Sequence, residues 1–229
     1  MGMLLLIRHA QASFGAADYD QLSSVGKEQS QRLGSWLKHV GRAPDLLASG
    51  SMRRHVETAE LCTEAAGMTA PRIVLGGLDE LNHVEIIARL RPDLATHEAL
   101  SAELSRADDS RRALQQIFAA ALERWISGQF DGEYTRTWHA FRSGVLADLQ
   151  RLAAHGARTI WAFTSGGPIA VVVNALLHAP SEETFTLSWP LVNTSMTQIG
   201  IGVRRNALIS YNSAPHLDGS GDRHLITHR

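Results

Sequence analysis

The sequence lacks several features that mark specialised classes of protein. Cys62 is the one cysteine among 229 residues, so an intrachain disulfide is excluded and a small buried side chain is the simplest role for its thiol. The longest apolar stretch, residues 168–177, contains Asn174 and is too short to span a bilayer. The first residues carry no basic region and no cleavage site, so we expect no secretory signal and a cytoplasmic protein.

An excess of one charge is also missing. The 22 Lys and Arg residues nearly balance the 23 Asp and Glu residues, which gives a net charge of −1. This balance argues against nucleic acid and the membrane surface as partners, and favours a small anionic molecule that is bound locally. The 11 histidines include no His-Glu-x-x-His spacing and only one cysteine could assist them, so we expect no metal and no cofactor. A homodimer is left open.

An apolar run that ends in Arg8 and His9 is the most informative local pattern. Residues 3–7 are all apolar, which is typical of a strand buried on both faces. Ligands of open α/β sheets bind at the carboxyl ends of the strands, so this strand delivers both side chains to the expected binding edge. An imidazole can attack phosphorus, and a guanidinium suits phosphate oxygens. The alternative is that both side chains only end the strand and face water.

Strands and helices alternate along most of the chain. We expect helices from Ser23 or Ser24 to Gly41, from Met52 to Gly67 and from Phe141 to Gly156, and further strands at 45–49, 72–75, 158–164, 196–203 and 207–211. Strand signals disappear between about 84 and 156, where residues 114–125 place apolar side chains on one helical face. The pattern predicts one α/β domain over residues 1–229, with a helical insertion or lid at about 84–156.

Several motifs in this order resemble those of the histidine phosphatase superfamily, also called the phosphoglycerate mutase-like family. Arg8-His9-Ala10 resembles the family's Arg-His-Gly, and residues 50–59 resemble its Ser-Pro-x-x-Arg-Ala-x-x-Thr-Ala. The second motif aligns Arg54 with the family's second phosphate-binding arginine and leaves Arg53 at a variable position. Leu78-Asp79-Glu80 resembles the family's Leu-x-Glu, and residues 193–197 and 212–217 resemble its late strands.

The resemblance implies a three-layer αβα sandwich with a mostly parallel central sheet. It further implies metal-independent phosphoryl transfer through a phosphohistidine at His9. Arg8 and Arg54 would neutralise the phosphate, and Glu80 would protonate the leaving group. Hydrolysis of a small phosphomonoester is favoured over mutase action, because nothing in the sequence marks a second phosphate site.

Two departures from the family pattern bear on activity. Ala10 replaces a glycine, which is a mild change. Ser165 stands where the family's Ser-His-Gly-Gly places a second active-site histidine, and a hydroxyl offers one neutral hydrogen bond in place of an imidazole. The site could therefore be a weakened enzyme, or a binding module for a phosphate ligand or phosphopeptide. The presence of both His9 and Glu80 favours the enzyme.

The turn after the strand at 158–164 permits a third interpretation. Gly166 and Gly167 allow close approach of the backbone, and free amides at the following helix start could face an anion, or the turn could be purely structural. Ser165 could also be the nucleophile of a serine hydrolase, with Asp218 or Asp222 and His216 or His224 as its partners. Phe163 argues against that alternative, because the required turn has a glycine at this position.

Two polar residues that follow His9 complete the candidate site. Gln11 and Ser13 come directly after the expected nucleophile, so their side chains either touch the phosphate or only close the loop.

Overall fold

The apolar run at the start of the chain forms the centre of a six-stranded sheet. The computed structural model describes residues 2–13, 20–219 and 222–228. Strand β1 (Gly2–Arg8) pairs in parallel with β4 (Thr159–Thr164) and antiparallel with β5 (Met196–Ile201). The strand order is β3-β2-β4-β1-β5-β6, and the remaining strands are β2 (Leu46–Ser49), β3 (Arg72–Val74) and β6 (Ala207–Ser213). The side chains of residues 4–7 are fully buried or nearly so, as expected for a strand covered on both faces.

The parallel strands bring three chain segments to one edge of the sheet. Strands β1, β2, β3 and β4 all run in the same direction, so their carboxyl ends lie together. Arg8, Ser49 and Thr164 end β1, β2 and β4, and the loops that follow them lead into the sequence motifs. This edge is the expected place for a binding site.

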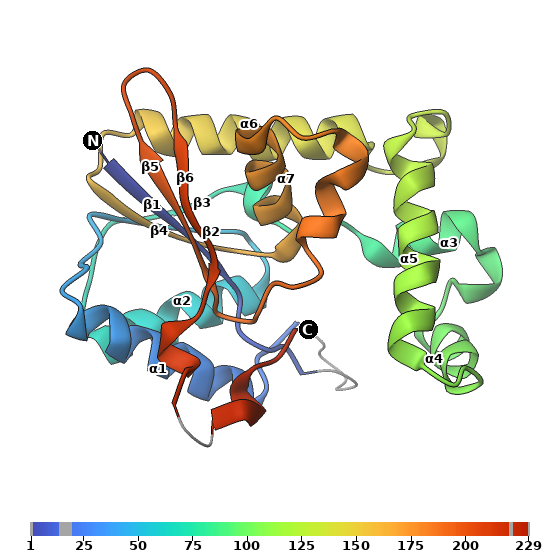
Figure 1. Ribbon diagram of the computed structural model, residues 1–229, viewed down its shortest axis with the longest axis horizontal. Coiled ribbons are helices and arrows are strands. Elements are labelled where there is room, and N and C mark those ends of the chain that lie inside the picture. The colour runs from blue at the N-terminus through green and yellow to red at the C-terminus, as the bar shows by residue number, and fades with distance from the viewer. Residues whose placement is uncertain (1, 14–19, 220–221, 229) are drawn as a thin grey trace.

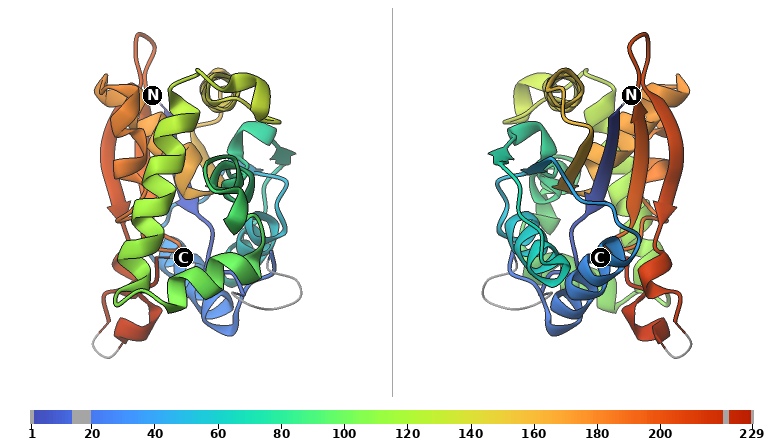
Figure 2. Two further views of the ribbon diagram at one scale, coloured as in Figure 1. Left: turned by 90° about the vertical axis from the view of Figure 1, so that its right-hand side faces the viewer. Right: turned by 90° about the vertical axis from the view of Figure 1, so that its left-hand side faces the viewer.

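Helices cover both faces of the sheet (Figure 1). Helices α1 (Ser24–His39) and α2 (Arg53–Ala66) pack on one face, and α6 (Trp138–Ala154) and α7 (Gly166–Leu177) pack on the other (Figure 2). Ser23 caps α1 by accepting a hydrogen bond from the Gly26 amide at 3.0 Å, which satisfies one of the free donors at the helix start. The predicted three-layer α/β architecture with a mostly parallel sheet is confirmed.

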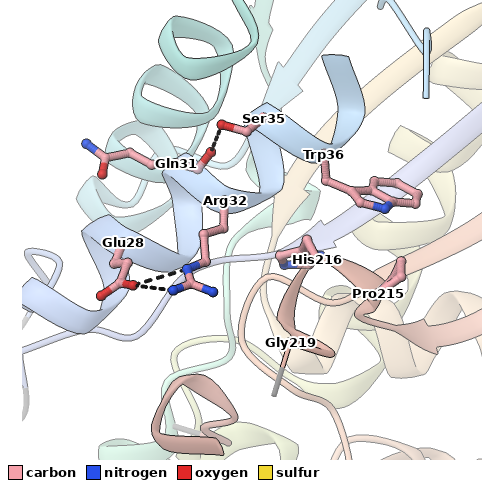
Figure 3. A pocket seen from close by; sticks show the side chains of 8 residues that line it. All are labelled: Glu28, Gln31, Arg32, Ser35, Trp36, Pro215, His216 and Gly219. Atoms are coloured by element: carbon pink, nitrogen blue, oxygen red, sulfur yellow. Dashed lines mark hydrogen bonds and ion pairs between the residues drawn. The ribbon is translucent and has the colours of Figure 1, made fainter. Parts of the chain in front are cut away.

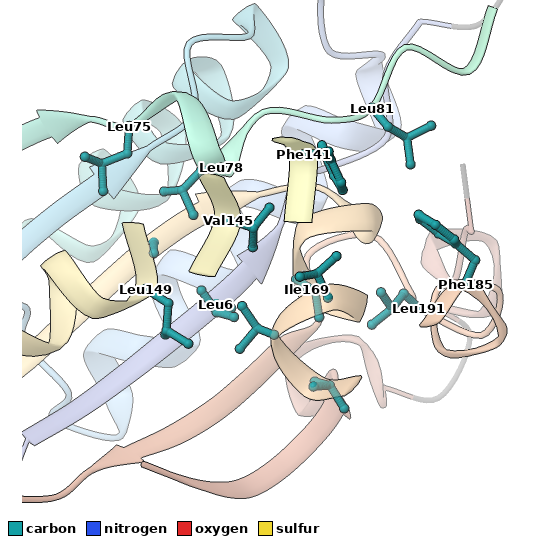
Figure 4. Packing of buried hydrophobic residues seen from close by; sticks show 14 of the residues in the cluster. Leu6, Leu75, Leu78, Leu81, Phe141, Val145, Leu149, Ile169, Phe185 and Leu191 are labelled. Atoms are coloured by element: carbon teal, nitrogen blue, oxygen red, sulfur yellow. The ribbon is translucent and has the colours of Figure 1, made fainter. Parts of the chain in front are cut away.

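Each face of the sheet has its own hydrophobic core. On the α6 and α7 face, Leu6 of β1 meets side chains of both helices, among them Val145 and Ile169 (Figure 4). On the opposite face, the neighbouring Leu5 and Ile7 pack with Leu33, Leu37, Ala59 and Cys62 of α1 and α2. The alternation of side chains along β1 thus supplies both cores from one strand.

The helices between β3 and β4 fall into two groups. Helices α3 (His83–Leu90), α4 (His97–Ser105) and α5 (Ser110–Ile126) stand on the side toward which the parallel strands end (Figure 1). Helix α6 instead lies along the sheet and contributes to its core. The fully buried Trp125 of α5 contacts Trp138 and Phe141 of α6, with ring centroids 5.5 and 5.6 Å apart, so aromatic packing joins the two groups.

The late motifs differ in detail from the expected strands. Residues 193–195 precede β5 as irregular chain, and residues 215–217 form a short 3-10 turn after β6. Pro215 begins that turn because it has no backbone N–H to continue the strand pairing. Among the described residues, no helix is both long and apolar enough to cross a membrane.

Candidate active site

His9 lies just past the end of β1 with its ring held in one orientation. Its backbone amide donates to the carbonyl of Thr164 at 2.8 Å, and its Nδ1 lies 2.8 Å from the carbonyl of Ala10. A carbonyl only accepts, so Nδ1 carries the proton and the other ring nitrogen, Nε2, has its lone pair available. Burial lowers the pKa of His9 well below its ordinary value, and the nearby positive charges of Arg54 and Arg8 lower it further. The ring is therefore neutral at physiological pH.

Arg54 and Arg53 point to different places. Arg54 is 6% exposed and lies close enough to influence His9, whereas Arg53 is on the surface and pairs with Glu57 at 2.6 Å. Sequence reasoning missed the partner of Arg54, which is Asp20, with Nη1 and Oδ1 2.5 Å apart. Asp20 also accepts a hydrogen bond from the Arg53 amide at 2.7 Å. The Arg54 guanidinium is thus paired with an acidic side chain.

The guanidinium of Arg8 is engaged by backbone carbonyls. Its Nη1 donates to the carbonyl of Leu191, and its Nη2 donates to the carbonyl of His228 at 3.0 Å. These contacts hold the charge of Arg8 near His9, where it contributes to the low pKa of the ring. They also bring residues from the far end of the chain to the candidate site.

Glu80 faces the start of α7. Its carboxyl group accepts a hydrogen bond from the Gly167 amide, 3.1 Å from Oε1 and 3.3 Å from Oε2. The amide of Leu81 also donates to Oε1 at 3.1 Å. The free amides that a helix start offers to an anion are thus partly taken by this carboxyl group. Gly166 is buried beside it.

Thr58 joins the two arginine motifs. Its hydroxyl accepts a hydrogen bond from the Ala10 amide at 3.0 Å and donates to the carbonyl of Arg54 at 2.6 Å. From the opposite side, Asn193 donates its side-chain amide to the carbonyl of His9 at 2.9 Å. The backbone around His9 is therefore fixed by side chains from distant parts of the chain.

Ser165 is fully buried at the junction between β4 and α7. Its hydroxyl lies 2.6 Å from Nε2 of His55, a residue that sequence reasoning did not single out. The backbone of Ser165 is extended, with φ −119° and ψ 174°, which differs from the strained turn of a serine nucleophile. His216, one of the expected hydrolase partners, instead has its Nε2 2.8 Å from the hydroxyl of Thr194. Signals for His55 were available, because it follows Arg54 directly and replaces the family's alanine.

Gln11 and Ser13 participate in the loop between β1 and α1. The side-chain oxygen of Gln11 accepts a hydrogen bond from the hydroxyl of Ser23 at 2.8 Å, and its carbonyl accepts from the Ser23 amide at 3.0 Å. The amide of Ser13 donates to the carbonyl of Gln21 at 2.8 Å. These contacts tie the loop to the start of α1. A phosphate contact by either side chain stays a prediction.

The candidate site does not coincide with a hollow on the described surface. That hollow, of about 460 Å³, lies between α1 and the turn at 215–217 (Figure 3). Its lining includes Arg32, which pairs with Glu28, together with Trp36, Pro215 and His216. None of His9, Arg54 or Glu80 lines it. Within the described residues, no group of three or more histidine, cysteine, aspartate or glutamate side chains could hold a metal ion.

Comparison with solved structures identifies the fold. An alpha-ribazole phosphatase from Shigella flexneri matches with a TM-score of 0.64 and 20% identity, over 93% of this chain and 96% of the other. A mycobacterial glucosyl-3-phosphoglycerate phosphatase in complex with inorganic phosphate matches with a TM-score of 0.61 and 21% identity, over 95% and 100%. A phosphoglycerate mutase from Bacillus anthracis matches with a TM-score of 0.61 and 16% identity, over 94% of each chain.

Comparison of sequences finds one family model that matches part of the chain. No curated protein matches the sequence significantly. Residues 4–112 match the family model described as histidine phosphatase superfamily, branch 1, and this segment contains His9, Arg54 and Glu80. The matched segment thus resembles this superfamily, and the fold of the whole chain is similar to the structures named above.

Proposed function

We propose that the protein hydrolyses a small phosphomonoester without a metal ion, through a phosphohistidine intermediate at His9. The state of the His9 ring is the observation that carries this proposal. Its Nδ1 donates to the Ala10 carbonyl, its Nε2 is left as the nucleophilic nitrogen, and its lowered pKa keeps it neutral. A neutral imidazole with one oriented lone pair is what attack on phosphorus requires.

Positive charge beside His9 supports the phosphoryl-transfer assignment. Arg54 is almost completely buried. When its ion pair with Asp20 breaks, its guanidinium can present two parallel donors to phosphate oxygens. Arg8 adds a second charge, although its carbonyl contacts make it an electrostatic rather than a freely directed partner. Charge compensation of this kind supplies most of the catalysis in phosphoryl transfer.

The proposed reaction has two steps. In the first, Nε2 of His9 forms a bond to phosphorus, the bond to the ester oxygen breaks, and the carboxyl group of Glu80 gives its proton to the departing alkoxide. In the second, water attacks the phosphohistidine, Glu80 takes back one proton from that water, and the P–N bond breaks to release phosphate. Both His9 and Glu80 return to their starting states, so no further reactant is needed.

The charged groups at the site bear on the choice between hydrolysis and isomerisation. Two of the structural neighbours are phosphatases and a third is a phosphoglycerate mutase, so the fold itself does not decide the reaction. The site brings two arginines, Arg8 and Arg54, close to His9, as expected for one phosphate group. We therefore favour hydrolysis over isomerisation, and expect α3–α5, which stand beyond the strand ends, to form the wall that selects the substrate.

The test is a turnover and trapping experiment with the purified protein, in the presence of a chelator. The wild type is expected to hydrolyse an aryl phosphate and to carry acid-labile, alkali-stable phosphate label, and His9→Ala should lose both while still binding inorganic phosphate. Undiminished turnover in His9→Ala would show the mechanism to be wrong. Normal phosphate binding without turnover or label in the wild type would assign the site to a binding module.

Glu80→Gln separates proton donation from binding. The variant should lose turnover of alkyl phosphates by about two orders of magnitude, because an alkoxide must be protonated as it leaves. It should lose much less with an aryl phosphate, whose leaving group is stable as an anion. Equal losses with both substrates would contradict the role of Glu80 as proton donor.

A further inference from the structure

A second imidazole faces His9 across the candidate site. His55, in the first turn of α2, is fully buried, and its ring centroid lies 5.7 Å from that of His9 with the planes tilted by 43°. A fully buried histidine needs partners for two nitrogens. Burying these polar atoms costs free energy that an apolar side chain in the same space would not cost. Its position next to the proposed nucleophile therefore calls for an explanation.

Both nitrogens of His55 point to polar groups on other elements. Nε2 lies 2.6 Å from the hydroxyl of Ser165, at the start of α7. Nδ1 lies 3.7 Å from Oδ1 of Asp79, which is ion-pair range but longer than a hydrogen bond. Asp79 is itself fixed by the amide and hydroxyl of Ser51, at 2.6 and 2.7 Å. The groups form a continuous series from Ser51 through Asp79 and His55 to Ser165.

Gly50 makes room for this series. A Cβ added at Gly50 would overlap both Nδ1 of His55 and Oδ1 of Asp79. The family motif has serine at the position of Gly50 and alanine at the position of His55. Both residues therefore depart from the motif, and the two lie against each other. The backbone of Gly50 is in turn held at the sheet by a hydrogen bond from its amide to the carbonyl of Phe163, 3.1 Å away.

We propose that His55 is a positioning residue of the phosphoryl site, which takes up a proton when a dianionic phosphoryl group binds and acts on that group through the hydroxyl of Ser165. This rests on the proposed function. In the free protein, Nδ1 carries the proton and faces Asp79, so Nε2 accepts the proton of Ser165. After one proton is taken from solvent, Nε2–H donates to the Ser165 oxygen, and the Ser165 proton is free to donate to a phosphoryl oxygen. The proton returns to solvent when phosphate leaves.

The charged groups around His55 make this uptake feasible. Burial lowers the pKa of His55 and Arg54 of α2 lowers it further, whereas Asp79 and Glu80, after β3, raise it. The neutral ring of His9 faces it from the end of β1. A dianion bound between His9 and Arg54 cancels the charge of Arg54 and adds negative charge, so both changes favour the protonated form of His55.

Proton uptake can be measured directly by calorimetry. The probe is tungstate, a phosphate-like dianion that does not itself titrate near neutral pH, bound to the full chain in two buffers of different ionisation enthalpy. The wild type should take up close to one proton per tungstate. His55→Gln should bind tungstate without uptake, because its amide can donate to Ser165 but cannot titrate, and its turnover should fall about tenfold to a hundredfold.

Two controls separate this proposal from the proposed function. His9→Ala should abolish turnover but keep the proton uptake, since the uptake belongs to His55. His216→Gln, which changes another buried histidine bonded to a hydroxyl, should also keep it. Uptake that survives in His55→Gln and disappears in His9→Ala would overturn the assignment to His55. A wild type that binds no tungstate would overturn both proposals.

An exchange of the two side chains tests whether the imidazole itself matters. His55→Ala should lose turnover, and Ser165→His alone should also be inactive, because the 2.6 Å contact leaves no room for two rings. The double variant His55→Ala/Ser165→His keeps one imidazole in the same buried space and should exceed His55→Ala at least tenfold. A double variant no better than His55→Ala, or covalent labelling of Ser165 by a fluorophosphonate, would contradict the proposal.

Discussion

At the scale of single residues, one hydroxyl holds the two arginine motifs together. Thr58 accepts from the buried Ala10 amide and donates to the Arg54 carbonyl. Thr58→Val keeps the shape but leaves that amide without a partner, so we expect a loss of about 1–3 kcal/mol in the free energy of unfolding, measured by urea denaturation. Thr58→Ser retains the hydroxyl and should lose much less. Equal losses in the two variants would mean that packing of the methyl group, and not the hydrogen bond, is what matters.

In the proposed mechanism, an incoming phosphate would displace Asp20 from Arg54. Its carboxylate lies 2.5 Å from the guanidinium and competes for the same donors. Asp20→Asn removes the negative charge, so inorganic phosphate should bind about three- to tenfold more tightly, as measured by calorimetry. Asp108→Asn, an exposed site between α4 and α5, removes the same charge from the surface and should leave the affinity unchanged. Weaker binding in Asp20→Asn would mean that Asp20 instead orients Arg54 for the ligand.

At the scale of elements, the short turn before Asp79 and Glu80 is fixed by its contact with α6. The amide of Gly77 donates to Asp148 at 2.7 Å, and a Cβ at Gly77 would overlap both that carboxylate and the carbonyl of Gly144. Gly77→Ala must therefore displace the turn, which should cost about 1–3 kcal/mol of stability and reduce turnover by shifting Glu80.

The neighbouring Gly76 offers a matched control, because a Cβ there meets no atom within 4 Å. Gly76→Ala should stay within about 0.5 kcal/mol of the wild type in thermal or urea unfolding, with unchanged turnover. If Gly76→Ala and Gly77→Ala lose the same stability, the effect lies in the turn backbone and not in the contact with α6.

At the scale of the whole molecule, a buried histidine outside the proposed catalytic groups makes stability depend on pH. Burial lowers the pKa of His216 to about 4, with Arg32 contributing, against about 6.5 in the unfolded chain. Between these values the unfolded chain binds a proton that the folded protein does not. His216 therefore contributes no penalty above pH 6.5 and costs about 3 kcal/mol of stability as the pH falls to 4.

Urea unfolding of the wild type and of His216→Gln at several pH values measures this contribution. Glutamine can keep a hydrogen bond with Thr194 but does not titrate, so the variant should lose less stability than the wild type on acidification. Parallel curves for the two proteins would show that His216 is protonated in the folded state as readily as in the unfolded chain.

The strands, and the order of the motifs along the chain, could be predicted from the sequence because they depend on local patterns. The run before Arg8 is apolar throughout, and the stripe of α2 ends at Gly67, which adopts the left-handed conformation with φ +63°. The contact of His55 with Ser165 joins residues 110 positions apart, and no periodicity reports such a pairing. The pairing of Asp20 with Arg54 is missed for the same reason.

The order in which the chain is synthesised gives the Arg8 contacts a further meaning. Arg8 belongs to the first strand, yet one of its carbonyl partners is His228, and Gln29 of α1 likewise donates to Leu225 and Thr227. All six strands end by residue 213, so they are synthesised before residues 225–228. Arg8 and Gln29 therefore receive these partners only after every strand of the sheet has been made, which places the contacts among the last that the growing chain can form.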